Sequence, residues 1–277
     1  MSTYTDYNAA AGDYDRTRYP VGSELVVAAL ATLDQPLADI RLLDAGCGSG
    51  NYAAALMRHV GRIDAIDVNP GMLAVAKTKL ADAVDQEAIA FHQGTLLALP
   101  FDDASFDAVM VNQVLHHLEP GTDARYDRHA QALTEIHRVL RPGGIVAVNF
   151  CSHRQIRHGF WFYGLIPEAR ADIVRRCISW PILDSTLKTI GYGSVSRIVA
   201  LDAVLQGPAY FDGLGPLDTA WRAGDSIWSA ASDGEIRSAE AEIRRRDKAG
   251  SLAQFVRDED AQRPDIGQFT LAIARKG

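Results

Sequence analysis

Three closely spaced glycines interrupt the chain directly after a short apolar run. Residues 40–44 form that run and end in Asp44, and Gly46, Gly48 and Gly50 follow before a helical pattern begins. Glycine adopts backbone conformations that other residues avoid, and it lets the backbone approach a ligand closely. A strand, a glycine turn and a helix in this order place a ligand at the start of the helix. The segment therefore predicts an α/β fold with a small-molecule site at its first turn.

The spacing of these glycines distinguishes between two classes of ligand. They read G-x-G-x-G, whereas a dinucleotide site reads G-x-G-x-x-G. Asp44 also stands directly before the turn, where a pyrophosphate would meet a negative charge and a cation would be attracted. The pattern favours S-adenosylmethionine (SAM), which carries a sulfonium and an amino group, over a nicotinamide dinucleotide.

Strand-like and helix-like segments alternate through the first 150 residues. Residues 1–36 look helical, and helices are also expected over 50–60, from the Asn69-Pro70 cap onward, and over 124–140. Strands are expected at 40–44, 62–67, 89–92, 106–111 and 145–150, and a last pair at 195–201 and 269–274. This alternation predicts a parallel sheet with helices on both faces.

The alternation breaks after residue 150. Residues 151–188 contain the aromatic run 160–163, which either walls an acceptor pocket or anchors a lid; the anchor is the favoured interpretation. A second aromatic surface comes from Tyr210, Phe211, Trp221 and Trp228. The charged run 237–248 alternates in sign, which is typical of a solvated helix.

Composition excludes several classes of protein. A net charge of −7 over 277 residues argues against a nucleic-acid binder. No apolar run approaches the ~20 residues of a membrane span, and the first residues lack the pattern of a signal peptide, so a cytoplasmic protein is expected. The three cysteines, at 47, 151 and 177, have neither disulfide-framework nor zinc spacing, and no metal is expected.

Five motifs in order give the chain a family resemblance. They are residues 44–50, Asp67, residues 94–96 ahead of 99–101, residues 106–109, and residues 140–144. Together they resemble the class I SAM-dependent methyltransferases, and most closely the small-molecule branch called type 11, with ubiquinone-type and trans-aconitate-type relatives. The resemblance implies an α/β, Rossmann-like, doubly wound sheet of seven strands, mostly parallel with the last strand antiparallel, with helical lid insertions.

The resemblance also implies an organisation of the chain. A single domain would span 1–277, with an N-terminal helical cover at 1–36 and a SAM-binding core at 37–150. A lid would follow at 151–190, and a C-terminal strand pair with a helical insertion at 191–277. The resemblance covers the first 150 residues well, so acceptor choice is expected to lie in the remainder.

Cofactor contacts follow from the matched positions. Asp44 would attract the ammonium, Asp67 would accept both ribose hydroxyls, and each has a simpler alternative as a carboxylate near a helix N-terminus. Thr95 stands where relatives usually have Asp, so the adenine contact is expected to be weaker or to come from the backbone near Leu96. The predicted cofactor-binding residues are Tyr14, Arg18, Asp44, Gly46, Gly48, Gly50, Asp67, Val68, Met72, Gly94, Thr95, Leu96 and Asn112.

The backbone carbonyl of Asn112 would also take the cofactor ammonium. Two other contacts have particular alternatives. Met72 would pack on the adenine, although a helical methionine is about as often plain core. Arg18 would pair with the cofactor carboxylate, but a solvated helix face explains it equally well.

The expected reaction is methyl transfer from SAM to an oxygen or nitrogen of a small-molecule acceptor by in-line displacement. His116 and His117 are the candidate catalytic bases, and at most one should face the cleft, because neighbours on a helix point in different directions. A non-methylating SAM-binding protein and, less favoured, a dinucleotide-dependent oxidoreductase remain alternatives. The acceptor and the oligomeric state stay open.

Overall fold

A seven-stranded sheet forms the centre of the molecule in the computed structural model, which describes residues 18–118 and 126–277. The strand order is β3-β2-β1-β4-β5-β7-β6. β1 pairs in parallel with β2 and β4, whereas β7 runs antiparallel between β5 and β6. The strands are β1 Arg41–Ala45, β2 Arg62–Asp67, β3 Ile89–Gln93, β4 Phe106–Asn112, β5 Leu140–Phe150, β6 Tyr192–Ala200 and β7 Phe269–Lys276. The predicted fold class is confirmed.

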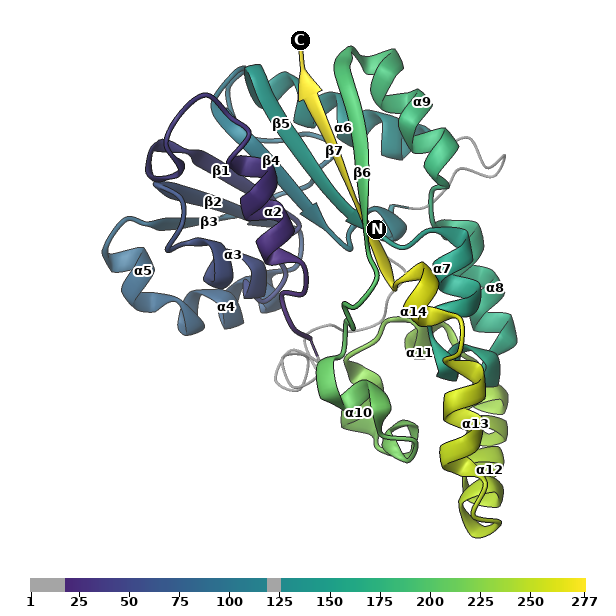
Figure 1. Cartoon of the computed structure of the whole chain (residues 1–277). Helices are drawn as coiled ribbons and strands as arrows, with labels where there is room; N and C mark the ends of the chain where they lie inside the picture. Colours follow the sequence, from purple (N-terminus) through teal and green to yellow (C-terminus); the bar gives the residue numbers. More distant parts are fainter. Residues whose placement is uncertain (1–17, 119–125) are drawn as a thin grey trace.

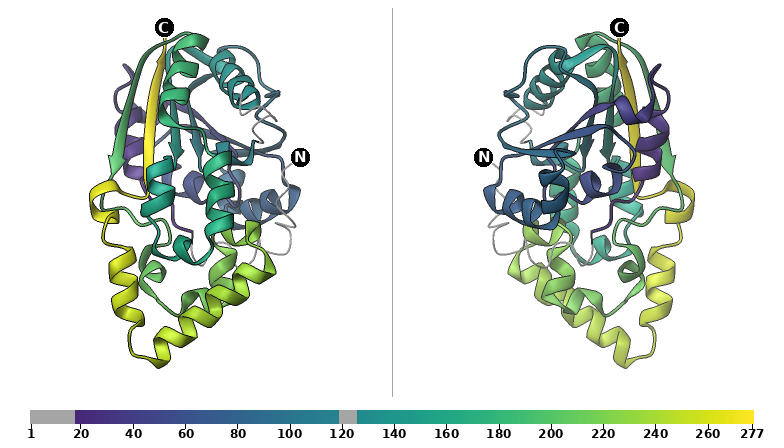
Figure 2. Two further views of the ribbon diagram at one scale, coloured as in Figure 1. Left: turned by 90° about the vertical axis from the view of Figure 1, so that its right-hand side faces the viewer. Right: turned by 90° about the vertical axis from the view of Figure 1, so that its left-hand side faces the viewer.

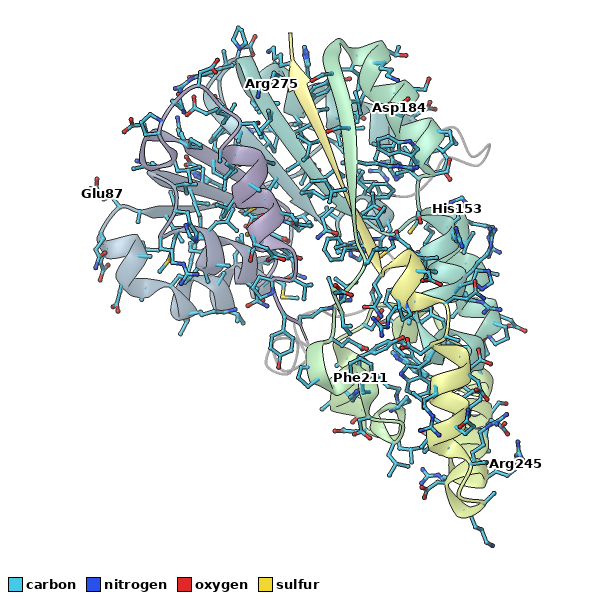
Figure 3. The ribbon with its side chains drawn as sticks, in the orientation of Figure 1. Glu87, His153, Asp184, Phe211, Arg245 and Arg275 are labelled. Carbon is cyan, nitrogen blue, oxygen red and sulfur yellow. The ribbon has the colours of Figure 1, made fainter. Side chains whose placement is uncertain are left out.

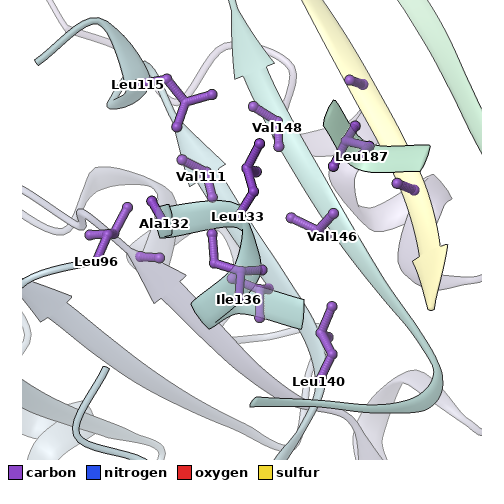
Figure 4. Close-up of a cluster of buried hydrophobic side chains, with 14 of the residues drawn as sticks. Leu96, Val111, Leu115, Ala132, Leu133, Ile136, Leu140, Val146, Val148 and Leu187 are labelled. Atoms are coloured by element: carbon purple, nitrogen blue, oxygen red, sulfur yellow. The ribbon is translucent and has the colours of Figure 1, made fainter. Parts of the chain in front are cut away.

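Helices cover both faces of this sheet, because the strands are apolar on both sides. Leu42 packs under α2 (Ser23–Leu30), α3 (Asn51–Leu56), α4 (Pro70–Lys79) and α5 (Ala81–Asp85), and its neighbour Leu43 packs on the opposite face. The opposite face is covered by α6 (Asp127–Val139) and α9 (Trp180–Ile190). Figure 4 shows Leu133 and Ile136 of α6 against Val111 of β4 and Val146 of β5.

The cap predicted for the helix after β2 is present. The Asn69 side-chain oxygen accepts hydrogen bonds from the backbone N–H groups of Gly71 (2.8 Å) and Met72 (3.0 Å), and Pro70 occupies the first helical position. Side-chain oxygens at this position satisfy N–H groups that lack partners inside the helix. The cap therefore fixes where the chain turns from the carboxyl end of β2 into α4.

A helical lobe lies beyond the carboxyl ends of β5 and β6 (Figures 1 and 2). Phe211 lies beside α10 and Arg245 near the far end of α12 (Figure 3). The elements of this lobe are α7 His153–His158, η3 Trp161–Leu165, α8 Pro167–Arg176, η4 Gly207–Phe211, η5 Gly215–Leu217, α10 Thr219–Ala223, α11 Ile227–Ala230, α12 Asp233–Lys248, α13 Leu252–Glu259 and α14 Arg263–Ile266. Within the described ranges, no helix is both long and apolar enough to cross a bilayer.

The aromatic run 160–163 forms part of the core of this lobe. All four side chains are buried, and Phe162 lies 5.0 Å from Trp221 and 5.9 Å from Trp228 between ring centroids. The run therefore anchors the lobe and does not wall an open pocket. Tyr210, Trp221 and Trp228 are buried in the same cluster, and only Phe211 of the second aromatic surface is exposed.

Several element boundaries differ from the predictions. Residues 201–268 join residues 151–177 in one hydrophobic cluster, whereas α9 packs on the sheet, so the lobe is built from two separate stretches of chain. Of the helix predicted over 1–36, the described residues contain only Ser23–Leu30. Just after this helix, the Arg275 guanidinium donates a hydrogen bond to the Thr32 carbonyl at 2.8 Å. α3 ends at Leu56, four residues earlier than expected.

Candidate cofactor site

The glycine turn connects three strands at the carboxyl edge of the sheet. The N–H groups of Gly46 and Cys47 both donate to the carbonyl of Ile66, at 2.8 and 3.0 Å. Gly46 has φ 85°, and a Cβ added there would lie 2.5 Å from a methyl group of Val114. Gly48 has φ 52°, and a Cβ added there would meet nothing within 4 Å. Gly46 is thus required for packing, whereas Gly48 faces open space.

This contrast predicts different consequences for two matched substitutions. Gly46→Ala forces a side chain against Val114 and should lower the free energy of unfolding by roughly 2–4 kcal/mol. Gly48→Ala should cost only about 1–2 kcal/mol of stability, from its positive φ, but should weaken binding of S-adenosylhomocysteine (SAH). Denaturant unfolding of both variants measures the loss of stability, and calorimetry measures their SAH affinity. Equal losses of stability with unchanged SAH affinity would contradict this placement of the turn.

Asp44 and Asn112 present unsatisfied polar atoms to a cleft beside the turn. Asp44 is 1% exposed and Asn112 is 9% exposed. Among residues 18–118 and 126–277, Oδ2 of Asp44 and both side-chain polar atoms of Asn112 have no hydrogen-bond partner. Burial, and then the charge of Asp67, raise the pKa of Asp44 to about 8. Because unsatisfied buried polar groups are costly, this pair fits a cationic, hydrogen-bonding ligand such as the ammonium group of SAM.

Asp67 ties the turn to the start of α4. Its Oδ2 accepts the Gly48 N–H at 2.8 Å, and its Oδ1 accepts the Asn69 N–H at 2.8 Å. Burial raises the pKa of Asp67, and these backbone bonds act against that rise. A carboxylate has about four acceptor positions, so two bonds leave capacity for two ribose hydroxyls.

The cleft beside the turn has about 530 Å³ of empty space, which includes space open to solvent. Arg18 and Leu205 line it from outside the glycine turn and the strands beside it. Its lining residues are Arg18, Tyr19, Asp44, Gly46, Cys47, Gly48, Ser49, Asn51, Tyr52, Asn112, Gln113 and Leu205. Tyr14, the other N-terminal residue predicted to bind the cofactor, lies outside the described residues.

The residues predicted for the adenosine lie beside Asp67, but none of them lines this cleft. Val68 is 63% exposed, whereas Met72 and Leu96 are buried. Gly94 donates its N–H to the Asp67 carbonyl at 3.0 Å, and a Cβ there would lie 2.8 Å from Ile66. The Thr95 hydroxyl accepts the Leu97 N–H at 3.2 Å. Gly50, the last glycine of the turn, does not line the cleft either. It faces Ala76 of α4, where an added Cβ would lie 3.2 Å from the Ala76 side chain.

The expectation that His116 and His117 point in different directions is wrong. They lie in the short 3₁₀ segment η2 (Leu115–His117), and their ring centroids are only 4.1 Å apart. Neither ring lines the cofactor cleft, although His116 borders a small neighbouring cavity with Cys151 and Cys177. Burial lowers both pKa values, that of His117 to about 4, and the nearby Arg18 and Arg176 lower them further. Both imidazoles are therefore neutral at pH 7.

Sequence reasoning missed several residues of the cleft. Gln113 has φ 54° and donates from its side chain to Asn149 at 2.7 Å. A strained residue at the end of a strand often marks a functional position, but the sequence gives no sign of this strain. Tyr52 donates its hydroxyl to the Val21 carbonyl at 2.8 Å and thereby joins α3 to the N-terminal segment. Leu205 comes from the far part of the chain, and no sequence signal points to it.

Known proteins match both the core and most of the chain. Residues 43–148 match the family described as "Methyltransferase domain". A demethylmenaquinone methyltransferase of Clavibacter sepedonicus is 33% identical over 220 residues, which cover 71% of this chain and 84% of that protein. An uncharacterized methyltransferase of Mycobacterium tuberculosis is 33% identical over 126 residues, or 46% of this chain, and the match spans 58% of that relative's length.

The fold has a counterpart among solved structures. The crystal structure of a putative methyltransferase from an antibiotic biosynthesis pathway of Anabaena variabilis superposes with a TM-score of 0.71. It is 18% identical in sequence, and the match covers 94% of this chain and 99% of that one. This likeness concerns the fold, whereas the Clavibacter match extends to the sequence. The chain belongs to the family of class I SAM-dependent methyltransferases.

Proposed function

We propose that this protein transfers a methyl group from SAM to an oxygen or nitrogen of a small-molecule acceptor. One observation carries the proposal: the buried carboxylate of Asp44 and the amide of Asn112 face the cleft with polar atoms that lack partners among the described residues. A ligand that brings an ammonium group donates to the Asp44 carboxylate and to the side-chain oxygen of Asn112 at once. The neighbouring glycine turn leaves open space for the rest of that ligand.

In this proposal the cofactor lies along the carboxyl edge of β1, β2 and β4. Asp44 and Asn112 take the ammonium group, Asp67 takes the ribose hydroxyls, and Arg18 takes the carboxylate. The adenine then extends past Val68 and Met72 towards residues 94–96. Thr95 already uses its hydroxyl oxygen for Leu97, so the adenine amino group is bonded mainly by the backbone there.

The chemistry needs alignment more than activation. The sulfonium is already a good leaving group, so the protein holds the acceptor in line with the bond that breaks and keeps water out. The relative from Clavibacter sepedonicus is named for demethylmenaquinone, so the reduced form of that quinone belongs in the panel of acceptors, with the methylated atom identified in the product.

A catalytic role for His116 or His117 stays a prediction. Both imidazoles are neutral at pH 7, as a general base requires. Their lowered pKa values also make them weak bases, since the ideal catalytic pKa lies near the operating pH. Because neither ring lines the cofactor cleft, an indirect role, such as shaping the acceptor side of the site, is favoured.

Transfer of labelled methyl groups tests the proposal. We expect SAM with a labelled methyl group to give labelled product with reduced demethylmenaquinone or with another hydroxyl or amino compound from a panel. Asp67→Ala should reduce transfer to every acceptor, because it acts on the cofactor. SAH binding without transfer to any acceptor would favour the non-methylating alternative. Binding of NAD in place of SAH would favour the oxidoreductase.

A further inference from the structure

A second buried carboxylate lies where the helical lobe meets the cofactor cleft. Asp225, between α10 and α11, is 4% exposed. The Tyr163 hydroxyl donates to it at 3.2–3.3 Å, and the Ile227 N–H donates to it at 3.2 Å. The Arg18 guanidinium is 3.8 Å from its Oδ1, and Arg18 itself lines the cofactor cleft. Asp225 therefore lies directly behind a residue of the cleft.

The surroundings of this carboxylate are otherwise aromatic. Tyr163 stacks on Phe160 at 4.3 Å between ring centroids, and both belong to the cluster that includes Trp221 and Trp228. Holding a carboxylate in such a place costs several kcal/mol unless its partners compensate. Burial raises the pKa of Asp225, and Arg18 lowers it. Arg18 is thus the cationic partner, but at 3.8 Å it makes a long ion pair.

The groups that face Asp225 come from three parts of the chain. Arg18 comes from the N-terminal segment, Tyr163 from η3, and the Cys151 thiol, which feels the charge of Asp225, from the end of β5. Cys151 in turn contacts Gln113 of the cleft at 3.4 Å. This polar cluster therefore borders the carboxyl ends of β4 and β5, next to the proposed cofactor position.

We propose that Asp225 binds the acceptor's nucleophilic O–H or N–H group once the cofactor carboxylate has drawn Arg18 away. The inference rests on the proposed function. Arg18 lies between the cleft and Asp225, so it is placed to pair with either carboxylate. When it pairs with the cofactor, Asp225 keeps its hydrogen bonds from Tyr163 and Ile227 but loses its cation. Cofactor binding thus precedes acceptor binding.

The reaction then balances without an additional reagent. The acceptor's O–H or N–H bond breaks and its proton passes to the Asp225 carboxylate. The new bond from oxygen or nitrogen to the methyl carbon forms as the bond from sulfur to that carbon breaks. The electron pair of the broken bond stays on sulfur and gives neutral SAH. Asp225 returns the proton to water after the product leaves.

This arrangement selects a class of acceptor. An uncharged phenol, alcohol or amine donates a hydrogen bond to Asp225 and has a proton to give. A carboxylate acceptor instead places a second negative charge against a buried one, and like charges in such a site cost several kcal/mol. The inference therefore excludes carboxylic acids and favours ring hydroxyl or amino compounds.

Phenol and benzoate form a matched pair of probes, because each is a single ring with one oxygen function. Binding of each to the SAH-saturated protein is measured by ligand-detected NMR. We expect phenol to bind at least roughly tenfold more tightly than benzoate, and phenol binding to weaken when SAH is left out. In Asp225→Asn, with SAH affinity retained, the preference for phenol should fall about tenfold because the negative charge is gone.

Asp218→Asn is the control, since Asp218 is an exposed helix cap in the same lobe and Asn caps equally well. Benzoate binding as tight as phenol binding, no binding of phenol, or an unchanged preference in Asp225→Asn would overturn the inference. The comparison of phenol with benzoate binding to the wild-type protein tests the inference even if Asp225→Asn fails to fold. SAH affinity, measured on the same samples, distinguishes failure of the inference about Asp225 from failure of the proposed function.

Discussion

Replacing Asp44 with asparagine will weaken SAH binding and stabilise the ligand-free protein. The loss of a charged hydrogen bond to the ammonium should weaken binding roughly 10- to 100-fold. The pKa of Asp44 is about 8 in the folded protein, against the usual 3.8. Ionisation of Asp44 therefore opposes folding increasingly as pH rises from about 4 to 8, and the uncharged amide of the variant carries no such cost. The variant's advantage should be small at pH 4 and on the order of 5 kcal/mol at pH 8.

The same pKa predicts a pH profile for binding. A cation beside Asp44 favours the ionised form, so wild-type SAH affinity should rise with pH towards pH 8 and binding should release a proton. Asp44→Asn should abolish both effects, which calorimetry in buffers of different ionisation enthalpy measures. Asp64→Asn is the contrast. Asp64 is equally buried but is bonded to Arg41 at 2.9 Å and His92 at 2.8 Å, so its loss should destabilise. Stabilisation in both variants would refute the account of Asp44.

Asp67→Ala should weaken SAH binding roughly 30- to 1000-fold, because two charge-assisted hydrogen bonds to the ribose are lost, at about 2–4 kcal/mol together. It should also lower stability, since the N–H groups of Gly48 and Asn69 lose their shared acceptor. Asp85→Ala removes an exposed carboxylate of α5 and serves as the control. Titration calorimetry and denaturant unfolding give both quantities. Unchanged SAH affinity in folded Asp67→Ala protein would show that the ribose lies elsewhere.

The sequence predicted those parts of the site that depend on local backbone chemistry. The backbone turn at the three glycines and the Asn69 cap depend only on groups a few residues away, and both are present. The parallel strands β4 and β5 were also predictable, because strands buried on both faces are continuously apolar. The alternation of strands and helices indicated the first five strands in chain order, and the glycine turn indicated the edge of the sheet at which the cleft lies.

The remaining features depend on contacts between distant residues. Leu205 reaches the cleft, and Asp225 reaches Arg18 beside it, only because residues 201–268 fold back onto residues 151–177. This pairing leaves no periodic pattern in the sequence. The rings of His116 and His117 lie together because the segment is a short 3₁₀ turn, whereas the prediction assumed an α-helix. Aromatic residues in the run 160–163 favoured a buried anchor over a pocket wall, and only the packing in the structure distinguishes the two.

Titration calorimetry of the unaltered chain with SAH, and separately with NAD, tests the central claim most directly. We expect saturable binding of SAH at one site per chain, tighter at pH 8 than at pH 6, and no binding of NAD. NAD binding at the same site, or no heat with SAH at concentrations on the order of 1 mM, would contradict the assignment of the cleft to SAM.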